Sequence, residues 1–146
     1  MAMRKIYIII MIALLAAAAA SCQKEDIDIC GEWHYSSAEN NEDIYIGFSS
    51  DGSFELYQKF EAGMYHLYCG KWTLNGNKLS GKYNDGATWH SSYKISVSGT
   101  SLTMTNAGTR HIYSRASIPD SVKETCIVEV KSLPLMLNSQ PQYCWL

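Results

Sequence analysis

The chain lacks a run of lysine or arginine, a C-x-x-C pair and a nucleophile elbow. These absences argue against nucleic-acid binding, metal binding and nucleophilic catalysis. Without a basic run, nucleic acid is not expected as a partner. The cysteines lie far apart, and the four histidines fall on separate predicted strands, so neither residue type has the close spacing along the chain that metal ligands show. No serine has the strand–turn–helix setting that a nucleophile elbow needs. We therefore predict a protein that is not an enzyme and has no catalytic residue, metal site or cofactor.

A long apolar run occurs at the N-terminus, over residues 6–20. It follows Arg4 and Lys5 and ends in small residues directly before Cys22. A basic start, an apolar centre and a small-residue end are typical of a secretory signal. A transmembrane anchor is the alternative, but a span needs about 20 apolar residues and this run is shorter. The sequence thus predicts a signal peptide over residues 1–21.

Small residues before Cys22, with a polar segment after it, resemble the lipobox of bacterial lipoproteins. The resemblance implies cleavage before Cys22, acylation of that cysteine and attachment to a membrane through it. Lipoboxes favour leucine where this chain has Ala19, and ordinary signal peptidase cleavage after Ala20 is the alternative. Residues 24–26 resemble the acidic tag that sends some Bacteroidota lipoproteins outward. The expected location is the bacterial outer membrane, on its periplasmic or cell-surface side.

Removal of the signal leaves enough chain for one domain with a small core. Arg4 and Lys5 leave with it, so 10 basic residues remain against 14 acidic ones, a net charge of about −4 at neutral pH. Acidic residues concentrate before residue 44, and we interpret residues 22–30 as an acidic tether. Export permits disulfides, and the remaining four cysteines allow three complete pairings that the sequence does not decide. Those cysteines, which are equally free to stay unpaired, are Cys30, Cys69, Cys126 and Cys144.

Short segments of alternating apolar and polar residues, separated by glycine turns, fill residues 31–115. Asn-Gly and Asp-Gly pairs supply the positive φ that tight hairpins require. Six such turns connect seven strands, and an eighth follows near residues 110–114, where either Ile112 or Tyr113 faces inward. One face of each strand is apolar and the other polar. A closed up-and-down barrel over residues 31–118 hides the apolar face and both edges, whereas a two-sheet sandwich is the alternative.

Gly31, Glu32 and Trp33 open the first strand, and Arg115 follows the last one. This G-x-W start, eight-strand meander and final arginine resemble lipocalins, and in particular the lipocalin-like lipoproteins of Bacteroidota. The resemblance implies an eight-stranded antiparallel barrel. It also implies that Arg115 stacks on Trp33 and closes one end of the barrel, a cation–π contact worth roughly 0.5–2 kcal/mol.

Large aromatic side chains dominate the predicted barrel interior. An eight-stranded barrel is either filled by such side chains or holds one small ligand, and both alternatives stay open here. The candidate ligand residues are Tyr35, Phe48, Tyr68, Trp72, Tyr83, Trp89 and Tyr93. We predict a binding protein for a small apolar or sugar-like ligand. A protein-interaction, inhibitor or assembly module with a solid core, acting on an envelope protein, is the alternative.

The segment after the barrel, residues 119–146, has helix-like sequence only over residues 119–124. Apolar residues continue beyond it, but Pro134 and Pro141 interrupt any regular element. Packing on the barrel, contact with a partner and poor order are the alternatives, and we expect a short helix followed by poor order.

Overall fold

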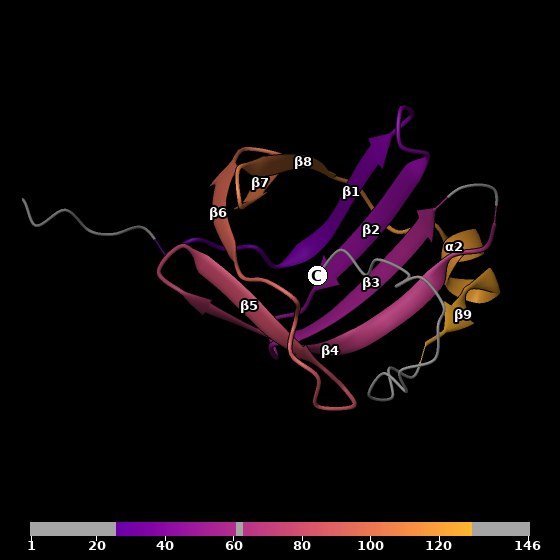
Figure 1. The fold of residues 1–146 in the computed structure, drawn as a ribbon, viewed down its shortest axis with the longest axis horizontal. Helices are drawn as coiled ribbons and strands as arrows, with labels where there is room; N and C mark the ends of the chain where they lie inside the picture. The colour runs from indigo at the N-terminus through magenta and orange to yellow at the C-terminus, as the bar shows by residue number, and fades with distance from the viewer. Residues whose placement is uncertain (1–25, 61–62, 130–146) are drawn as a thin grey trace, which may run out of the picture.

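The computed structural model describes residues 26–60 and 63–129, with the backbone alone at residue 60 (Figure 1). The expected signal peptide, the Cys22 lipidation site and Cys144 lie outside the described residues. Eight antiparallel strands follow one another: β1 (Gly31–Ser37), β2 (Glu42–Phe48), β3 (Ser53–Phe60), β4 (His66–Asn75), β5 (Lys78–Tyr83), β6 (Tyr93–Ser98), β7 (Ser101–Asn106) and β8 (Thr109–Arg115).

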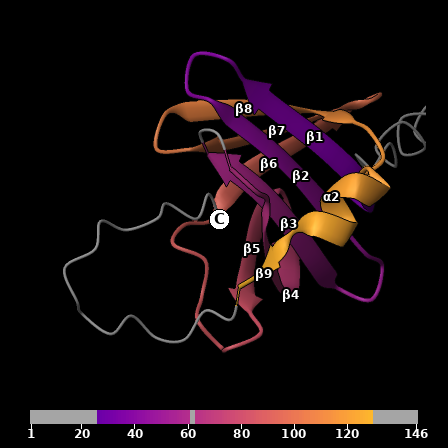
Figure 2. The same ribbon diagram turned by 90° about the vertical axis from the view of Figure 1, so that its right-hand side faces the viewer.

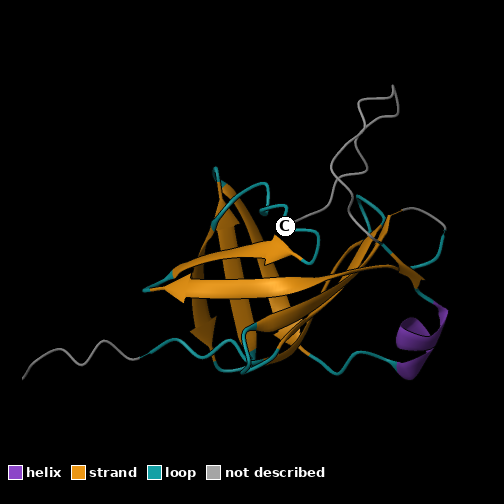
Figure 3. Ribbon diagram, turned by 90° about the horizontal axis from the view of Figure 1, so that it is seen from below, coloured by secondary structure: helices purple, strands orange, loops and turns teal. Residues whose placement is uncertain are grey.

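Each strand pairs with the next one in sequence, and β8 pairs with β1, so the sheet closes on itself. Figure 3 shows the strands surrounding the interior. The turn chemistry explains this order: Gly76, at φ +63°, connects β4 to β5 in the tight hairpin that Asn-Gly predicts. The predicted eight-stranded up-and-down barrel is confirmed.

The alternation of side chains also follows the sequence pattern. In β2, Ile44, Ile46 and Phe48 are all buried on the inner face. In β8, Tyr113 is 3% exposed and Ile112 is 49% exposed, which settles which of the two faces inward. Alternation alone would put Met64 on the same face as Tyr68 of the fourth strand, but Met64 precedes β4 and is 53% exposed. The strand starts later because Met64 belongs to the connection from β3.

Two of the strand pairings in the barrel, which we call its joints, are short. β1 pairs with β8 through Trp33–Arg115 and His34–Ser114. β5 pairs with β6 through Lys78–Lys94 and Leu79–Tyr93. The other neighbouring strands pair over five to seven residues each. The barrel therefore consists of a five-stranded part, β1–β5, and a three-stranded part, β6–β8.

A short helix, α2 (Asp120–Thr125), lies on the outside of the barrel beside β2 and β3 (Figure 2). Ile118 and Val122 pack there against Tyr57 of β3 in a second apolar cluster, apart from the interior. Glu32 holds the start of the helix, because its carboxylate accepts hydrogen bonds from the Ile118 amide, at 2.8 Å, and from Nζ of Lys123, at 3.1 Å. The helix lies where the sequence indicated one.

A two-residue strand, β9 (Ile127–Val128), follows α2 and pairs in parallel with the start of β4. The sequence pattern did not predict it, because two residues are too few to show a period. The rest of the C-terminal segment, residues 130–146, lies outside the described residues. In the part of the chain that the structure describes, no helix has both the length and the apolarity needed to cross a bilayer.

Candidate functional site

Most of the predicted interior residues lie in one buried cluster. Phe48, Tyr68, Tyr83, Trp89 and Tyr93 are at most 7% exposed, while Tyr35 and Trp72 are half-buried and pack against the same cluster. Apart from Trp89, which precedes β6, these aromatic residues lie on strands. Their side chains point inward together because alternate residues of one strand share a face. The interior is thus apolar and aromatic.

The rings form a continuous row through the interior. The Phe54 ring meets Trp89 and Tyr83 edge-on, with centroids 5.0 and 5.9 Å apart. Tyr83 continues to Tyr68 at 6.1 Å, and Trp89 continues to Tyr93 at 6.4 Å. Such edge-to-face pairs stabilise by about 0.5–1.5 kcal/mol beyond their buried area. One end of the row is Tyr68, and the other is Tyr93.

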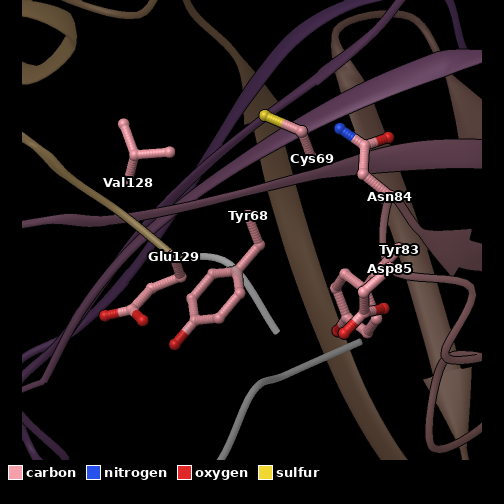
Figure 4. Close-up of a pocket in the computed structure, with 7 residues that line it drawn as sticks. All are labelled: Tyr68, Cys69, Tyr83, Asn84, Asp85, Val128 and Glu129. Carbon is pink, nitrogen blue, oxygen red and sulfur yellow. The ribbon is translucent and has the colours of Figure 1, made fainter. Parts of the chain in front are cut away.

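Tyr68 and Tyr83 line a cavity of about 220 Å³ at a gap in the barrel wall (Figure 4). β5 pairs with the second half of β4 and ends at Tyr83, whereas β9 pairs with the first half of β4 and ends at Val128. Between these two ends is a gap, where Tyr68 and Cys69 have no strand partner on this side of β4 and the Cys69 carbonyl accepts a hydrogen bond from the Asn84 amide at 3.0 Å. We call this gap the wall slot; its lining is Tyr68, Cys69, Tyr83, Asn84, Asp85, Val128 and Glu129.

The charged groups that line the wall slot are all anionic. Asp85 and Glu129 bring carboxylates, Asn84 brings an amide, and the lining contains no lysine or arginine. Oε1 of Glu129 lies 2.5 Å from Nδ1 of His66, which fixes that carboxylate at the rim. Asp85 accepts a hydrogen bond from the Ala87 amide at 2.9 Å. The slot therefore combines aromatic faces with hydrogen-bond acceptors, which suits a small ligand that carries hydroxyl or amino groups.

The cysteines do not provide a nucleophile there. Burial raises the pKa of the Cys69 thiol, and the nearby Glu55 carboxylate raises it further, which disfavours the reactive thiolate. Cys30, Cys69 and Cys126 are all free thiols. Cys126 directly precedes β9, whose first residue, Ile127, pairs with His66, about 10 Å along β4 from Cys69. Disulfides require Cα atoms within about 7 Å, so a Cys69–Cys126 bridge does not fit this fold.

A second group of polar side chains lies in the interior near β8. His111 is 7% exposed and meets the edge of the Tyr35 ring at 5.1 Å, and Tyr35 also contacts Tyr113. A histidine on a strand is usually exposed, but His111 is buried because it shares the inner face of β8 with Tyr113. Burial lowers the pKa of His111. Burial raises the pKa of Tyr35, and the Glu42 carboxylate raises it further.

His34 and Asp43 form a pair on the outer surface, with Nε2 and Oδ1 2.6 Å apart. Tyr65 donates a hydrogen bond to the other Asp43 oxygen at 2.5 Å, and the His34 ring stacks on Tyr45. Burial alone would raise the pKa of Asp43, but the hydrogen bonds from Tyr65 and His34 hold it below its usual range. These contacts join β1, β2 and the residue before β4, so the pair has a structural role. Among the described residues, no three His, Cys, Asp or Glu side chains gather as a metal site would require.

Arg115 lies over Trp33 at the closed end of the barrel, with Cζ 4.0 Å from the ring centre. Its Nη1 also donates to the Cys30 carbonyl at 3.0 Å, and the Trp33 indole donates to the Ile29 carbonyl at 2.8 Å. Gly31 is required beneath the guanidinium, since its φ is +125° and an added Cβ would collide with Nη1. Both outer residues of the G-x-W segment therefore contribute to the same contact: Gly31 leaves space for Arg115, and Arg115 covers Trp33.

Residues 21–104 match a family model, that of the lipocalin-like domain. The chain belongs to the lipocalin-like family. The match covers more than half of this lipocalin-like protein and most of its barrel. Barrels of this family are typically binding proteins rather than enzymes, and the buried aromatic row is consistent with binding.

Two solved structures resemble this lipocalin-like chain, each with a TM-score of 0.46. An uncharacterized protein from Bacteroides eggerthii DSM 20697 is 16% identical over 61% of this chain and all of its own length. A lipocalin-like protein from Bacteroides uniformis ATCC 8492 is 20% identical over 60% of this chain and 98% of its own. No curated protein matches the sequence.

Proposed function

We propose that this lipocalin-like chain is a lipid-anchored binding protein of the bacterial cell envelope that takes a small, sugar-like ligand and performs no chemistry. The wall slot carries the proposal. It brings two tyrosines from the interior row together with an amide and two carboxylates. Aromatic faces cover the apolar side of a sugar ring, while acceptors take its hydroxyls. The volume of 220 Å³ lies below the roughly 300–1,000 Å³ of most ligand clefts, so one ring is the expected size.

Support for the envelope location comes from the sequence. The charged start, apolar run and Cys22 remain the basis for export and for acylation, and the segment 24–26, which resembles an acidic export tag, favours an outward-facing leaflet of the outer membrane. Acyl chains anchor firmly because each buried CH₂ contributes about 0.8 kcal/mol. Intact mass of the membrane-extracted protein tests this. A mature chain that begins at Cys22 with added acyl mass supports the anchor, whereas an unmodified chain beginning at Ser21 contradicts it.

Ligand binding is tested by thermal shift against a library of monosaccharides and a library of fatty acids and other small apolar molecules. A ligand at 100 times its Kd stabilises the folded state by about 2.7 kcal/mol and raises the melting temperature accordingly. The double variant Tyr68→Phe/Tyr83→Phe keeps both rings and removes both hydroxyls. A sugar-like ligand should then bind about 5- to 150-fold more weakly, since each of the two lost hydrogen bonds contributes about 0.5–1.5 kcal/mol. Tyr45→Phe, on the outer surface, is the control and should leave the affinity unchanged.

A protein-interaction module with a solid core is the second candidate. It is favoured by the side chains exposed next to the slot on β9, where Val128 is 66% exposed and Ile127 is 39% exposed. An envelope protein that covered β9 would hide both. If neither library shifts the melting temperature and a Val128→Asp variant loses a co-purifying envelope protein, the module replaces the small-ligand proposal.

A further inference from the structure

The outer face of β4–β8 is basic. Five strands contribute to it, and none of them contains an aspartate or a glutamate. The exposed cationic residues on this face are Lys71, Lys78, Lys82, Lys94 and Arg110. These cationic residues are far apart in the sequence and are brought together only by the pairing of neighbouring strands. The sequence therefore contains no basic run that would have indicated this face.

Lysines on this face are direct partners across strands. Lys71 is opposite Lys82, and Lys78 is opposite Lys94. Like charges directly opposite each other destabilise a sheet. An anion placed between them would remove that repulsion, so the arrangement favours a negatively charged ligand.

A groove of about 460 Å³ opens on this face between β5 and the segment before β6. The register explains it: Leu79 pairs with Tyr93, but Lys82 pairs with Thr88, so two extra residues are accommodated between the two pairings. This bulge displaces residues 90–92 from the ladder. The groove lining includes the cationic side chains of Lys71 and Lys82, the imidazole of His90 and the hydroxyls of Thr73, Ser80 and Ser92.

Trp89 and Gly81 also line this groove. Trp89 is 5% exposed, and its indole Nε1 has no hydrogen-bond partner among the described residues. A buried donor without a partner costs about 1–3 kcal/mol, so the position of this ring beneath the groove is energetically unfavourable for its N–H. Gly81 lets the ring lie against the strand, because a Cβ there would come within 2.8 Å of Nε1.

We propose that this groove binds an anionic saccharide, one whose sugar units carry sulfate or phosphate groups. The two lysines take the anionic group and the hydroxyls of Thr73, Ser80 and Ser92 take the sugar hydroxyls. Lys71 already pairs with the Asp51 carboxylate at 3.4 Å. Both partners of that pair are about two-thirds exposed, so solvent screens it and an anion displaces it readily.

A saccharide fits better than a lipid surface. A membrane-binding face combines cations with exposed large apolar side chains that enter the bilayer. Of the exposed large apolar residues in the described part of the chain, Ile112 alone lies on β4–β8. The face is otherwise hollowed and rich in hydroxyls, as a polar polymer requires.

Binding of the exported full chain to dextran sulfate, with neutral dextran as the uncharged reference, tests the proposal. We expect dextran sulfate to bind at 50 mM salt, to weaken as salt rises, and neutral dextran not to bind. The variant Lys71→Gln/Lys82→Gln should bind about fivefold more weakly, from two lost surface ion pairs. Its melting temperature should not fall, because it removes a repulsive pair.

Lys59→Gln/Lys123→Gln is the matched control, with the same charge change outside this face, and should alter binding less than twofold. The proposal is overturned if both double variants weaken binding equally, since only net charge would then matter. It is also overturned if wild-type protein ignores dextran sulfate but binds phosphatidylglycerol vesicles, which would make the face a membrane surface.

Discussion

Gly81→Ala tests directly whether Trp89 is seated against β5. Gly81 has no positive φ, so alanine fits the strand backbone, and the only obstacle is the indole. An added Cβ would lie 2.6 Å from Cζ2 and 2.8 Å from Nε1 of Trp89. Contacts under 3.0 Å require something to move. Trp89 cannot move freely, because its ring already packs on Phe54 and Tyr93.

The expected cost follows from two opposing effects. Overpacking a well-filled core destabilises by about 1–3 kcal/mol. Replacing glycine with alanine reduces the entropy of the unfolded chain and returns about 0.4–1 kcal/mol. The free energy of unfolding should therefore fall by roughly 1–2 kcal/mol, and the melting temperature by roughly 5–12 °C for a domain of this size.

Urea unfolding followed by circular dichroism measures this change. Gly63→Ala is the matched control: a Cβ there meets nothing within 4 Å, so the variant should be as stable as the wild type or slightly more stable. Gly81→Ala combined with Trp89→Leu should show a coupling energy of about 0.5–3 kcal/mol, because leucine withdraws the atoms that clash. If Gly81→Ala is as harmless as Gly63→Ala, the packing of Trp89 on β5 is wrong.

Three further predictions concern other parts of the barrel. Arg115→Lys should lower the free energy of unfolding by about 1 kcal/mol, since lysine lacks the plane that covers Trp33; equal stability in urea would refute the stacking role. Because the pKa of His111 is lowered, the unfolded state binds protons more readily, and stability should decrease as pH falls below about 6.5; in His111→Phe, melting temperatures measured between pH 7 and 5 should change less. The pKa of Asp43 is lowered instead, so its contribution is present above about pH 4 and disappears as pH falls through the folded value; Asp43→Asn should flatten that acid decrease in stability, and an unchanged slope would contradict it.

Strand positions were predictable because two local signals agreed. Alternating side chains and glycine turns both depend on the local backbone conformation, so each indicates where a strand begins and ends. Once eight such strands share an apolar face, closing the sheet into a barrel is the way to bury that face. Even Trp89 was placed correctly on the inner face, although β6 begins only at Tyr93. The bulge adds two residues, and an even insertion leaves the facing of the side chains unchanged.

Features that depend on distant segments were not predictable. β9 forms because the chain returns to β4, and Ile127 and Val128 alone carry no period. His111 is buried by strand phase although histidine usually prefers the surface. The wall slot arises from where β5 and β9 end, so the sequence named Tyr68 and Tyr83 as candidates but had no means to add Asp85 or Glu129. The basic face likewise requires knowing which strands are neighbours.

The short β1–β8 and β5–β6 joints have a consequence for amide hydrogen exchange. Each joint is held by two register pairs, so β6–β8 can separate from the rest while its own hairpins stay intact. Amide protons of β6 and β8 at the joints should then exchange together and well before those in the centre of β2 and β3. Such an opening uncovers Tyr93 and Tyr113 for a moment, and the interior becomes reachable from solvent without loss of the five-stranded part.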